Sequence, residues 1–295
     1  ASRGLGDVYK RQTYAQGYFV YDSRKSGSRT TSHLRFGPNP IEAPYLVTKA
    51  GFIGIHAWGI LESIDVLTMA REGTTVLLNS PYGPDEVWGK LPRTFQQQIV
   101  DKKLDLWTID ALSVAREVGL RNRTNTILQT CFFAISGVLP KDEAIERIKD
   151  SIQKTYGKKS QKIVDMNHAA VDASLEHLFQ VKVPESVDAS HDLVEPVRDD
   201  SPEFVKTITA KMITGEGDLL PVSSLPADGT YPAGTTRFEH RTLSDVIAEW
   251  DPQACIQCGN CAFVCPHGVI RAKYYQKSAL ELSLIHISEP TRRYA

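Results

Sequence analysis

The chain has 295 residues, of which 41% are apolar and 23% are charged, and its formal net charge is −1. This composition is typical of a globular protein with one sizeable core and a smaller module. It excludes the basic excess of nucleic-acid-binding proteins, and no uninterrupted apolar segment reaches the length that spans a bilayer.

The two ends look foreign to the protein. Asp7–Gln12 can be encoded by DNA whose complementary strand encodes Leu282–Ile287. This pairing resembles the transposase mosaic end of a sequencing library. We therefore interpret residues 1–12 and 282–295 as adapter sequence, exclude them from fold reasoning and expect a gene truncated on both sides.

Short β-rich runs alternate with helical patterns from Gly17 to about Lys182. The runs are residues 17–21, 32–36, 52–56, 74–79 and 106–109, and helical patterns fill most gaps between the later ones. Such alternation predicts an α/β fold with a mainly parallel sheet covered by helices.

Two helices are predicted at the end of this region. Residues 141–156 carry Ile145, Ile148 and Ile152 on one stripe and acidic residues in the first turn, which predicts an amphipathic helix. A second helix is predicted over about 161–179. Cys131, in an apolar run between the strands and these helices, is interpreted as a core residue.

Residues 79–86 follow an apolar strand and begin a helical pattern. Ligands gather at such strand ends in α/β sheets. However, Asp85 and Glu86 would repel a phosphate at the helix start, so we interpret this segment as a tight turn without a ligand role.

Residues 184–250 are rich in Pro, Asp, Ser and Gly. Their apolar residues are too few to repay the entropy of ordering them alone. This composition predicts an irregular connector that wraps over neighbouring domains or stays mobile, and no third compact core.

The most specific motif is CxxCxxCxxxCP, formed by Cys255, Cys258, Cys261, Cys265 and Pro266. This spacing is that of bacterial ferredoxin segments that hold 4Fe-4S clusters. Zinc sites usually separate two Cys pairs by a dozen or more residues, which makes zinc the weaker interpretation. Cysteines used in this way indicate a reducing compartment, and we expect a cytoplasmic protein.

In two-cluster ferredoxins, the first three cysteines of a repeat bind the nearer cluster and the fourth binds its neighbour. Cys255, Cys258 and Cys261 would therefore share one cluster, and Cys265 would belong to the other. No second repeat follows within this chain. Neither cluster would have four protein ligands from this chain alone.

Several segments resemble pyruvate:ferredoxin (flavodoxin) oxidoreductase. Residues 16–27, 32–38, 78–88 and 129–140 are similar to its gamma-type domain, and residues 156–159 and 167–175 extend the match. Residues 239–241, Glu-His-Arg, lie where that family has Glu-Lys-Arg. The resemblance implies a gamma-type domain at 13–183, the connector at 184–250 and the first half of a two-cluster 4Fe-4S ferredoxin domain at 251–281.

In that family, a thiamine-diphosphate enzyme converts pyruvate and coenzyme A to acetyl-CoA and CO2 and passes electrons singly through 4Fe-4S clusters. The thiamine diphosphate and Mg of the full-length enzyme would lie outside this piece, which alone should be inactive and supplies no catalytic residue. Ferredoxin or flavodoxin would accept the electrons. The rest of the same polypeptide would be a partner, the enzyme would be a homo-oligomer, and neither nucleic acid nor a membrane would be bound. The alternatives are an enzyme for another 2-oxo acid and a non-enzymatic ferredoxin-type electron-transfer subunit.

The segment from residue 22 to residue 29 follows a predicted strand and offers three cations, three hydroxyls and a glycine. Hydroxyls, amides and Arg bind phosphate oxygens. The resemblance implies that the gamma-type domain closes over the coenzyme A route, which makes Ser23, Arg24, Lys25 and Ser26 candidate coenzyme A ligands. A solvated hairpin loop remains the alternative.

Overall fold

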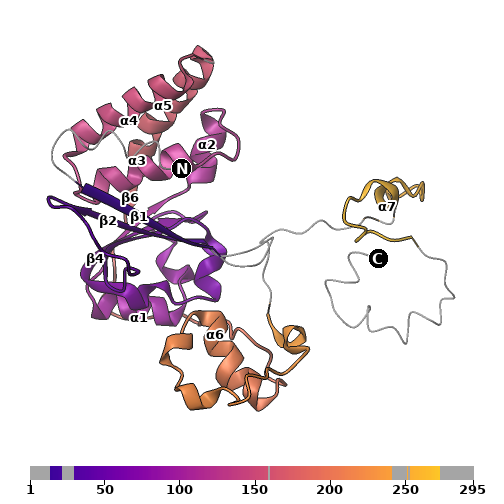
Figure 1. Ribbon diagram of the computed structural model, residues 1–295. Coiled ribbons are helices and arrows are strands. Elements are labelled where there is room, and N and C mark those ends of the chain that lie inside the picture. Colours follow the sequence, from indigo (N-terminus) through magenta and orange to yellow (C-terminus); the bar gives the residue numbers. More distant parts are fainter. Residues whose placement is uncertain (1–13, 22–29, 159, 241–250, 252, 273–295) are drawn as a thin grey trace. The chain divides into compact units, whose positions relative to one another are not determined.

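The computed structural model describes residues 14–21, 30–158, 160–240, 251 and 253–272 (Figure 1). The chain divides into two compact units, Ala1–Leu243 and Ser244–Ala295. No helix in these described ranges is both long and apolar enough to cross a membrane.

A four-stranded sheet is the centre of the first unit. Its strands are β3 (Ala50–Ile55), β4 (Ala70–Asn79), β5 (Asp105–Ile109) and β6 (Phe179–Gln180), in the order β3-β4-β5-β6. The first three are parallel, and β6 is antiparallel to β5. The prediction of an α/β fold with a mainly parallel sheet is confirmed.

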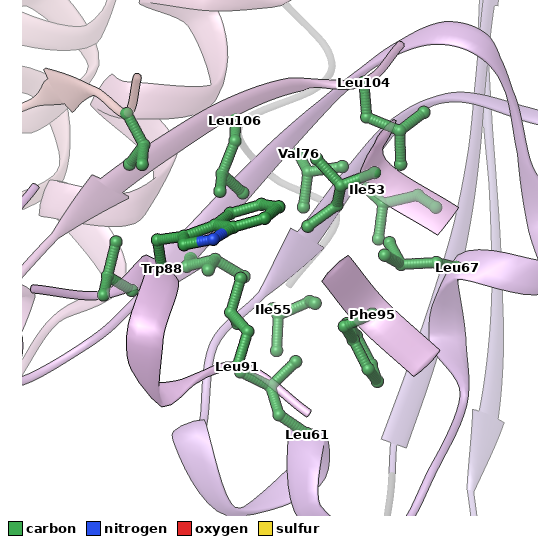
Figure 2. Close-up of a cluster of buried hydrophobic side chains, with 14 of the residues drawn as sticks. Ile53, Ile55, Leu61, Leu67, Val76, Trp88, Leu91, Phe95, Leu104 and Leu106 are labelled. Atoms are coloured by element: carbon green, nitrogen blue, oxygen red, sulfur yellow. The ribbon is translucent and has the colours of Figure 1, made fainter. Parts of the chain in front are cut away.

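The first face of the sheet packs on α1 (Arg93–Asp101). Val76 and Leu78 of β4 lie in one buried cluster with Phe95 and Ile99 of α1. Figure 2 shows Val76 and Leu106 beside Trp88 in this cluster. Alternate residues of a strand point to opposite faces, so Leu77 leaves this cluster. Burying a side chain such as Phe95 contributes about 1.5–3 kcal/mol.

The second face is covered by α2 (Ala111–Glu117), α3 (Asn125–Ile135) and α5 (Gln161–Glu176), on the side opposite α1 in Figure 1. Leu77 and Ile109 pack there against buried helix residues, among them Cys131. Burial raises the pKa of the Cys131 thiol to about 12. Cys131 is therefore a core residue, as predicted.

The helix predicted over residues 141–156 is confirmed as α4 (Lys141–Tyr156), and Ile148 and Ile152 pack against Val164 and Val171 of α5. The predicted end of α5 at residue 179 is wrong, because α5 ends at Glu176 and Phe179 belongs to β6. The amide of Val181 donates to Leu106 O at 2.8 Å. Residues 179–181 therefore pair with the edge of the sheet and do not continue the helix.

The first two predicted strands do not join the sheet. β1 (Tyr14–Tyr21) and β2 (Thr30–Gly37) form a separate antiparallel pair. A parallel pair needs a crossover of a dozen or more residues, and the link between these strands is shorter. The ring of Phe36 contacts Phe132 of α3, with centroids 5.9 Å apart.

Residues 183–194, called the strap below, wrap over the α1 face. Val183 and Leu193 pack against the cluster of that face, and the amide of Val194 donates to Glu62 O at 2.6 Å. The sequence left two alternatives for the connector, wrapping or mobility, and the strap wraps over the α1 face.

The rest of the connector has more structure than predicted. Val197, Val205 and Ala210 form a small buried cluster, although we expected no core there. A π-helical turn, Val205–Thr209, continues into α6 (Ala210–Thr214), and Val197 bridges to Glu239. Short 3-10 turns complete the unit at Trp58–Glu62, Val66–Met69, Trp88–Lys90, Gly217–Leu219, Val222–Ser224 and Thr235–Phe238.

Candidate functional site

The cysteine segment forms the described part of the second unit. Its one helix among the described residues is α7 (Asn260–Val264), which follows Gly259 at φ 75°. Gln257 also has a positive φ, 57°, a conformation that non-glycine residues rarely adopt. The chain therefore turns sharply on both sides of the second cysteine, Cys258.

Backbone amides surround two of the four sulfurs. The amide of Gln257 donates to Cys255 Sγ at 3.4 Å. Hydrogen bonds from the amides of Ile270, His267 and Val269 hold the pKa of the Cys265 thiol below its ordinary value. A thiolate is the form that binds iron, so these amides favour the ligating state of the sulfur.

The structure does not bring the four thiols together. Within the described residues, no three His, Cys, Asp or Glu side chains are close enough to hold a metal ion. All four cysteines are free; Cys258 and Cys261 are exposed, and Cys255 and Cys265 are partly exposed. Metal binding and folding are coupled in small metal-binding modules, which commonly take their ligand geometry only with the metal bound.

The donor set fits an iron–sulfur cluster by its chemistry. Four free thiols, two of them near amide donors, lie within one short segment. Ile256, Phe263, Val264 and Val269 expose 70–90% of their surface. A segment with so little buried apolar surface has no core of its own to fix its shape. We therefore treat the ligand assignment of the four cysteines as a proposal below.

The coenzyme A candidates Ser23, Arg24, Lys25 and Ser26 lie outside the described residues. They belong to the segment that links β1 to β2, whose described ends, Tyr21 and Thr30, are paired. Their assignment stays a prediction.

A second candidate site lies where the parallel strands end. The side chain of Asn79, the last residue of β4, donates through Nδ2 to His56 O at 2.9 Å. Its Oδ1 accepts from the amide of Ala111 at 3.0 Å, and the amide of Ser80 donates to Ile109 O at 2.9 Å. Asn79 thus joins the carboxyl ends of β3, β4 and β5, where ligands of α/β sheets usually bind.

Two clefts open beside these strand ends, and Tyr82 lines both. The smaller, of about 150 Å³, lies between the residue 81–84 turn, the end of β5 and the start of α2. It is also lined by Thr108, whose buried hydroxyl has no hydrogen-bond partner within the described structure. The larger, of about 350 Å³, lies between Trp58, Lys90 and the strap.

Sequence reasoning interpreted residues 79–86 as a tight turn without a ligand role. The turn is present, since the amides of Glu86 and Val87 both donate to Gly83 O. Yet the same segment lines both clefts, a property that the sequence analysis missed. The segment follows an apolar strand, which is the signal for a ligand site, but the sequence reasoning gave more weight to the carboxylates of Asp85 and Glu86.

Comparisons with known proteins agree with this architecture. A family model described as "4Fe-4S binding domain" matches residues 247–270, which makes the chain an iron–sulfur protein by class. A model described as "Pyruvate ferredoxin/flavodoxin oxidoreductase" matches residues 1–177, more than half of the chain. The chain therefore belongs to the pyruvate ferredoxin/flavodoxin oxidoreductase family, and the resemblance read from the sequence is confirmed. A third model, "Domain of unknown function", matches residues 190–244.

Several curated relatives match nearly all of the chain. A "Putative pyruvate-flavodoxin oxidoreductase" from Synechocystis is 55% identical over 268 residues, which is 90% of this chain. The "Pyruvate-flavodoxin oxidoreductase" of Rhodospirillum rubrum is 53% identical over 88% of this chain, and the "Pyruvate:ferredoxin oxidoreductase" of Moorella thermoacetica is 46% identical over 88%. The chain spans only 22% of the length of each of these relatives.

Proposed function

We propose that this chain is a piece of an enzyme that oxidises pyruvate with coenzyme A. The reaction of the intact enzyme would convert pyruvate and coenzyme A to acetyl-CoA and CO2, with release of one proton and two electrons. The observation that carries the proposal is the CxxCxxCxxxCP segment joined to a domain of the pyruvate ferredoxin/flavodoxin oxidoreductase family.

The role of the cysteines follows from their spacing. Cys255, Cys258 and Cys261 would bind one 4Fe-4S cluster, and Cys265 would bind a neighbouring cluster. The amides near Cys265 support this role because they lower the pKa of its thiol and so stabilise negative charge on the sulfur. The remaining ligands would come from parts of the polypeptide beyond this piece.

The substrates would meet the enzyme in different places. Ser23, Arg24, Lys25 and Ser26 would hold phosphates of coenzyme A through charge-assisted hydrogen bonds. Thiamine diphosphate with Mg, bound elsewhere in the intact enzyme, would supply the stabilised carbanion chemistry of decarboxylation. This piece would contribute coenzyme A binding and electron transfer, and it would be inactive alone.

The electron acceptor would be a flavodoxin or a ferredoxin, the two acceptors that the names of the relatives contain. A reducing cytoplasm would suit clusters held partly by exposed cysteines. We further propose that the intact enzyme is a homo-oligomer.

The test is an assay of the intact enzyme, expressed from the complete gene and purified without oxygen. We expect flavodoxin or ferredoxin reduction that requires both pyruvate and coenzyme A, with one CO2 released per two electrons. Faster turnover of another 2-oxo acid would reject pyruvate as the substrate. Clusters that dithionite reduces but pyruvate with coenzyme A does not would favour a non-enzymatic electron-transfer subunit.

A further inference from the structure

The larger cleft at the strand ends has an aromatic inner wall and a rim of charged and polar side chains. It is lined by Trp58, Leu61, Glu62, Tyr82, Lys90, Pro92, His191, Asp192 and Val194 and has a volume of about 350 Å³. This volume is within the range of small-molecule sites. Its outer side is the strap, which two hydrogen bonds fix: Arg93 N to His191 O at 2.9 Å and Thr94 N to Asp192 Oδ1 at 3.0 Å.

Two aromatic rings form the inner wall. The centroids of Trp58 and Tyr82 are 5.2 Å apart, and their planes meet at 70°. In this edge-to-face arrangement, at least one ring keeps faces that its partner does not cover. Both residues are only half-buried. An uncovered ring face of this kind is a surface on which a planar heteroaromatic group can stack.

The charged side chains at the rim of the cleft differ in how many contacts they already make within the protein. Lys90 Nζ lies 5.5 Å from the centroid of the Tyr82 ring, and Lys90 is exposed. Asp192 accepts from the amides of Thr94 and Leu193 and lies near Arg93, and its pKa is lowered. The carboxylate of Asp192 is thus engaged in hydrogen bonds that hold the strap, whereas the exposed ammonium group of Lys90 can bind an anion.

Two further rim residues can hydrogen-bond a ligand. The carboxylate of Glu62 is exposed and can accept from ribose hydroxyls or from an exocyclic amino group, as acidic residues do in nucleotide sites. The imidazole of His191, also exposed, can donate to a phosphate oxygen. A planar base, a diol and a phosphate are the three parts of a nucleotide.

We propose that this cleft binds an adenosine phosphate, with the base against Trp58 and Tyr82 and the phosphate near Lys90. The adenosine phosphate has two possible sources, a free adenine nucleotide or the nucleotide end of coenzyme A. Only the second source rests on the proposed function.

The experiment measures binding of AMP, coenzyme A and 4′-phosphopantetheine to the intact enzyme by equilibrium dialysis. Phosphopantetheine serves as the control ligand because it lacks the nucleoside. We expect Trp58→Leu to weaken AMP binding by about tenfold or more, since losing one base–aromatic stack has effects of this order. Trp58→Phe should keep most of the affinity because it keeps a ring.

Matched variants separate local from general effects. Trp107→Leu removes a half-buried tryptophan that packs on the opposite face of the sheet, and it should leave AMP binding unchanged. Lys90→Gln should weaken AMP binding, and the difference from the unmodified enzyme should shrink at high salt. Lys103→Gln, which alters an exposed lysine paired with Glu72, is the control for charge.

The outcomes decide whether the cleft binds a nucleotide and whether that nucleotide is free or belongs to coenzyme A. A loss of coenzyme A affinity in Trp58→Leu, with phosphopantetheine unaffected, assigns the cleft to coenzyme A. A loss of AMP affinity alone assigns it to a free nucleotide. Equal AMP affinities in Trp58→Leu, Lys90→Gln and their controls would overturn the proposal. Dialysis requires no turnover, so this result is independent of whether pyruvate is the substrate.

Discussion

One buried side chain, Gln96, makes several of the hydrogen bonds that hold the strap, and its replacement gives the sharpest test of the fold. Gln96 in α1 is fully buried, and its Nε2 donates to Trp88 O at 2.8 Å and to Asp188 Oδ1 at 2.9 Å. Its Oε1 accepts from the amides of Asp188 and Ala189, both at 2.9 Å. We expect Gln96→Leu to loosen the strap from α1. The leucine fills about the same volume in the helix but makes no hydrogen bonds.

The size of the effect follows from burial. Ala189 is 2% exposed, so its amide would lose its partner without gaining water, at a cost of about 1–3 kcal/mol. Asp188 is exposed, and water can replace the partner of its amide. Taking about 2 kcal/mol, amide hydrogen exchange in the strap should become faster by about thirtyfold, since 1.4 kcal/mol corresponds to tenfold.

The assay is hydrogen exchange followed by mass spectrometry on the intact enzyme. Gln97→Leu is the matched control, because Gln97 is exposed and its Nε2 donates to Asp101 Oδ1 of the same helix at 2.9 Å. An exposed substitution of this kind should change stability by less than about 0.5 kcal/mol. Equal strap exchange in the two variants would refute the reasoning, as would faster exchange spread equally over β4.

The other predictions concern the two proposed sites and the smaller cleft. Replacing Arg24 and Lys25 together by Ala should raise the KM for coenzyme A by about tenfold or more and change the KM for pyruvate little, because two charge-assisted phosphate contacts are lost; equal changes would reject the loop assignment. Cys258→Ala should reduce the iron and sulfide content and the reductant-sensitive absorption of the intact enzyme, and unchanged contents would remove Cys258 from the ligand set. Thr108→Val should stabilise the fold by about 1 kcal/mol in chemical denaturation, because the buried hydroxyl of Thr108 lacks a partner. Destabilisation of that size would instead mean that the hydroxyl is paired.

Local patterns predicted the elements well where the local sequence decides them. The bounds of α4 agree with the prediction because Asp142 and Glu143 begin the helix and the isoleucine stripe finds a partner face on α5. The β-rich runs are all strands for a similar reason. Their pairing was harder to predict, because the length of a link decides whether two strands can be parallel, and β1 and β2 have too short a link.

Contacts between distant segments could not be predicted from the sequence. Gln96 and Ala189 are 93 residues apart along the chain, and no periodicity links a helix to a proline-rich connector. The aromatic pair of the larger cleft, Trp58 and Tyr82, comes from two loops that the sheet brings together. The cysteine motif was recognisable because its spacing alone encodes its chemistry, whereas the clefts depend on the assembled sheet.

The strap connects the first prediction to the proposed nucleotide site. His191 and Asp192 form the outer side of the larger cleft, and the same strap is anchored through Gln96, which lines neither cleft. A change of AMP affinity in Gln96→Leu would therefore report the position of this wall, whereas Trp58→Leu reports direct contact with the base. If the strap wall acts only by holding the base against the ring of Trp58, the double variant Gln96→Leu/Trp58→Leu should lose little more AMP affinity than Trp58→Leu alone, because without the ring the wall has nothing to hold the base against.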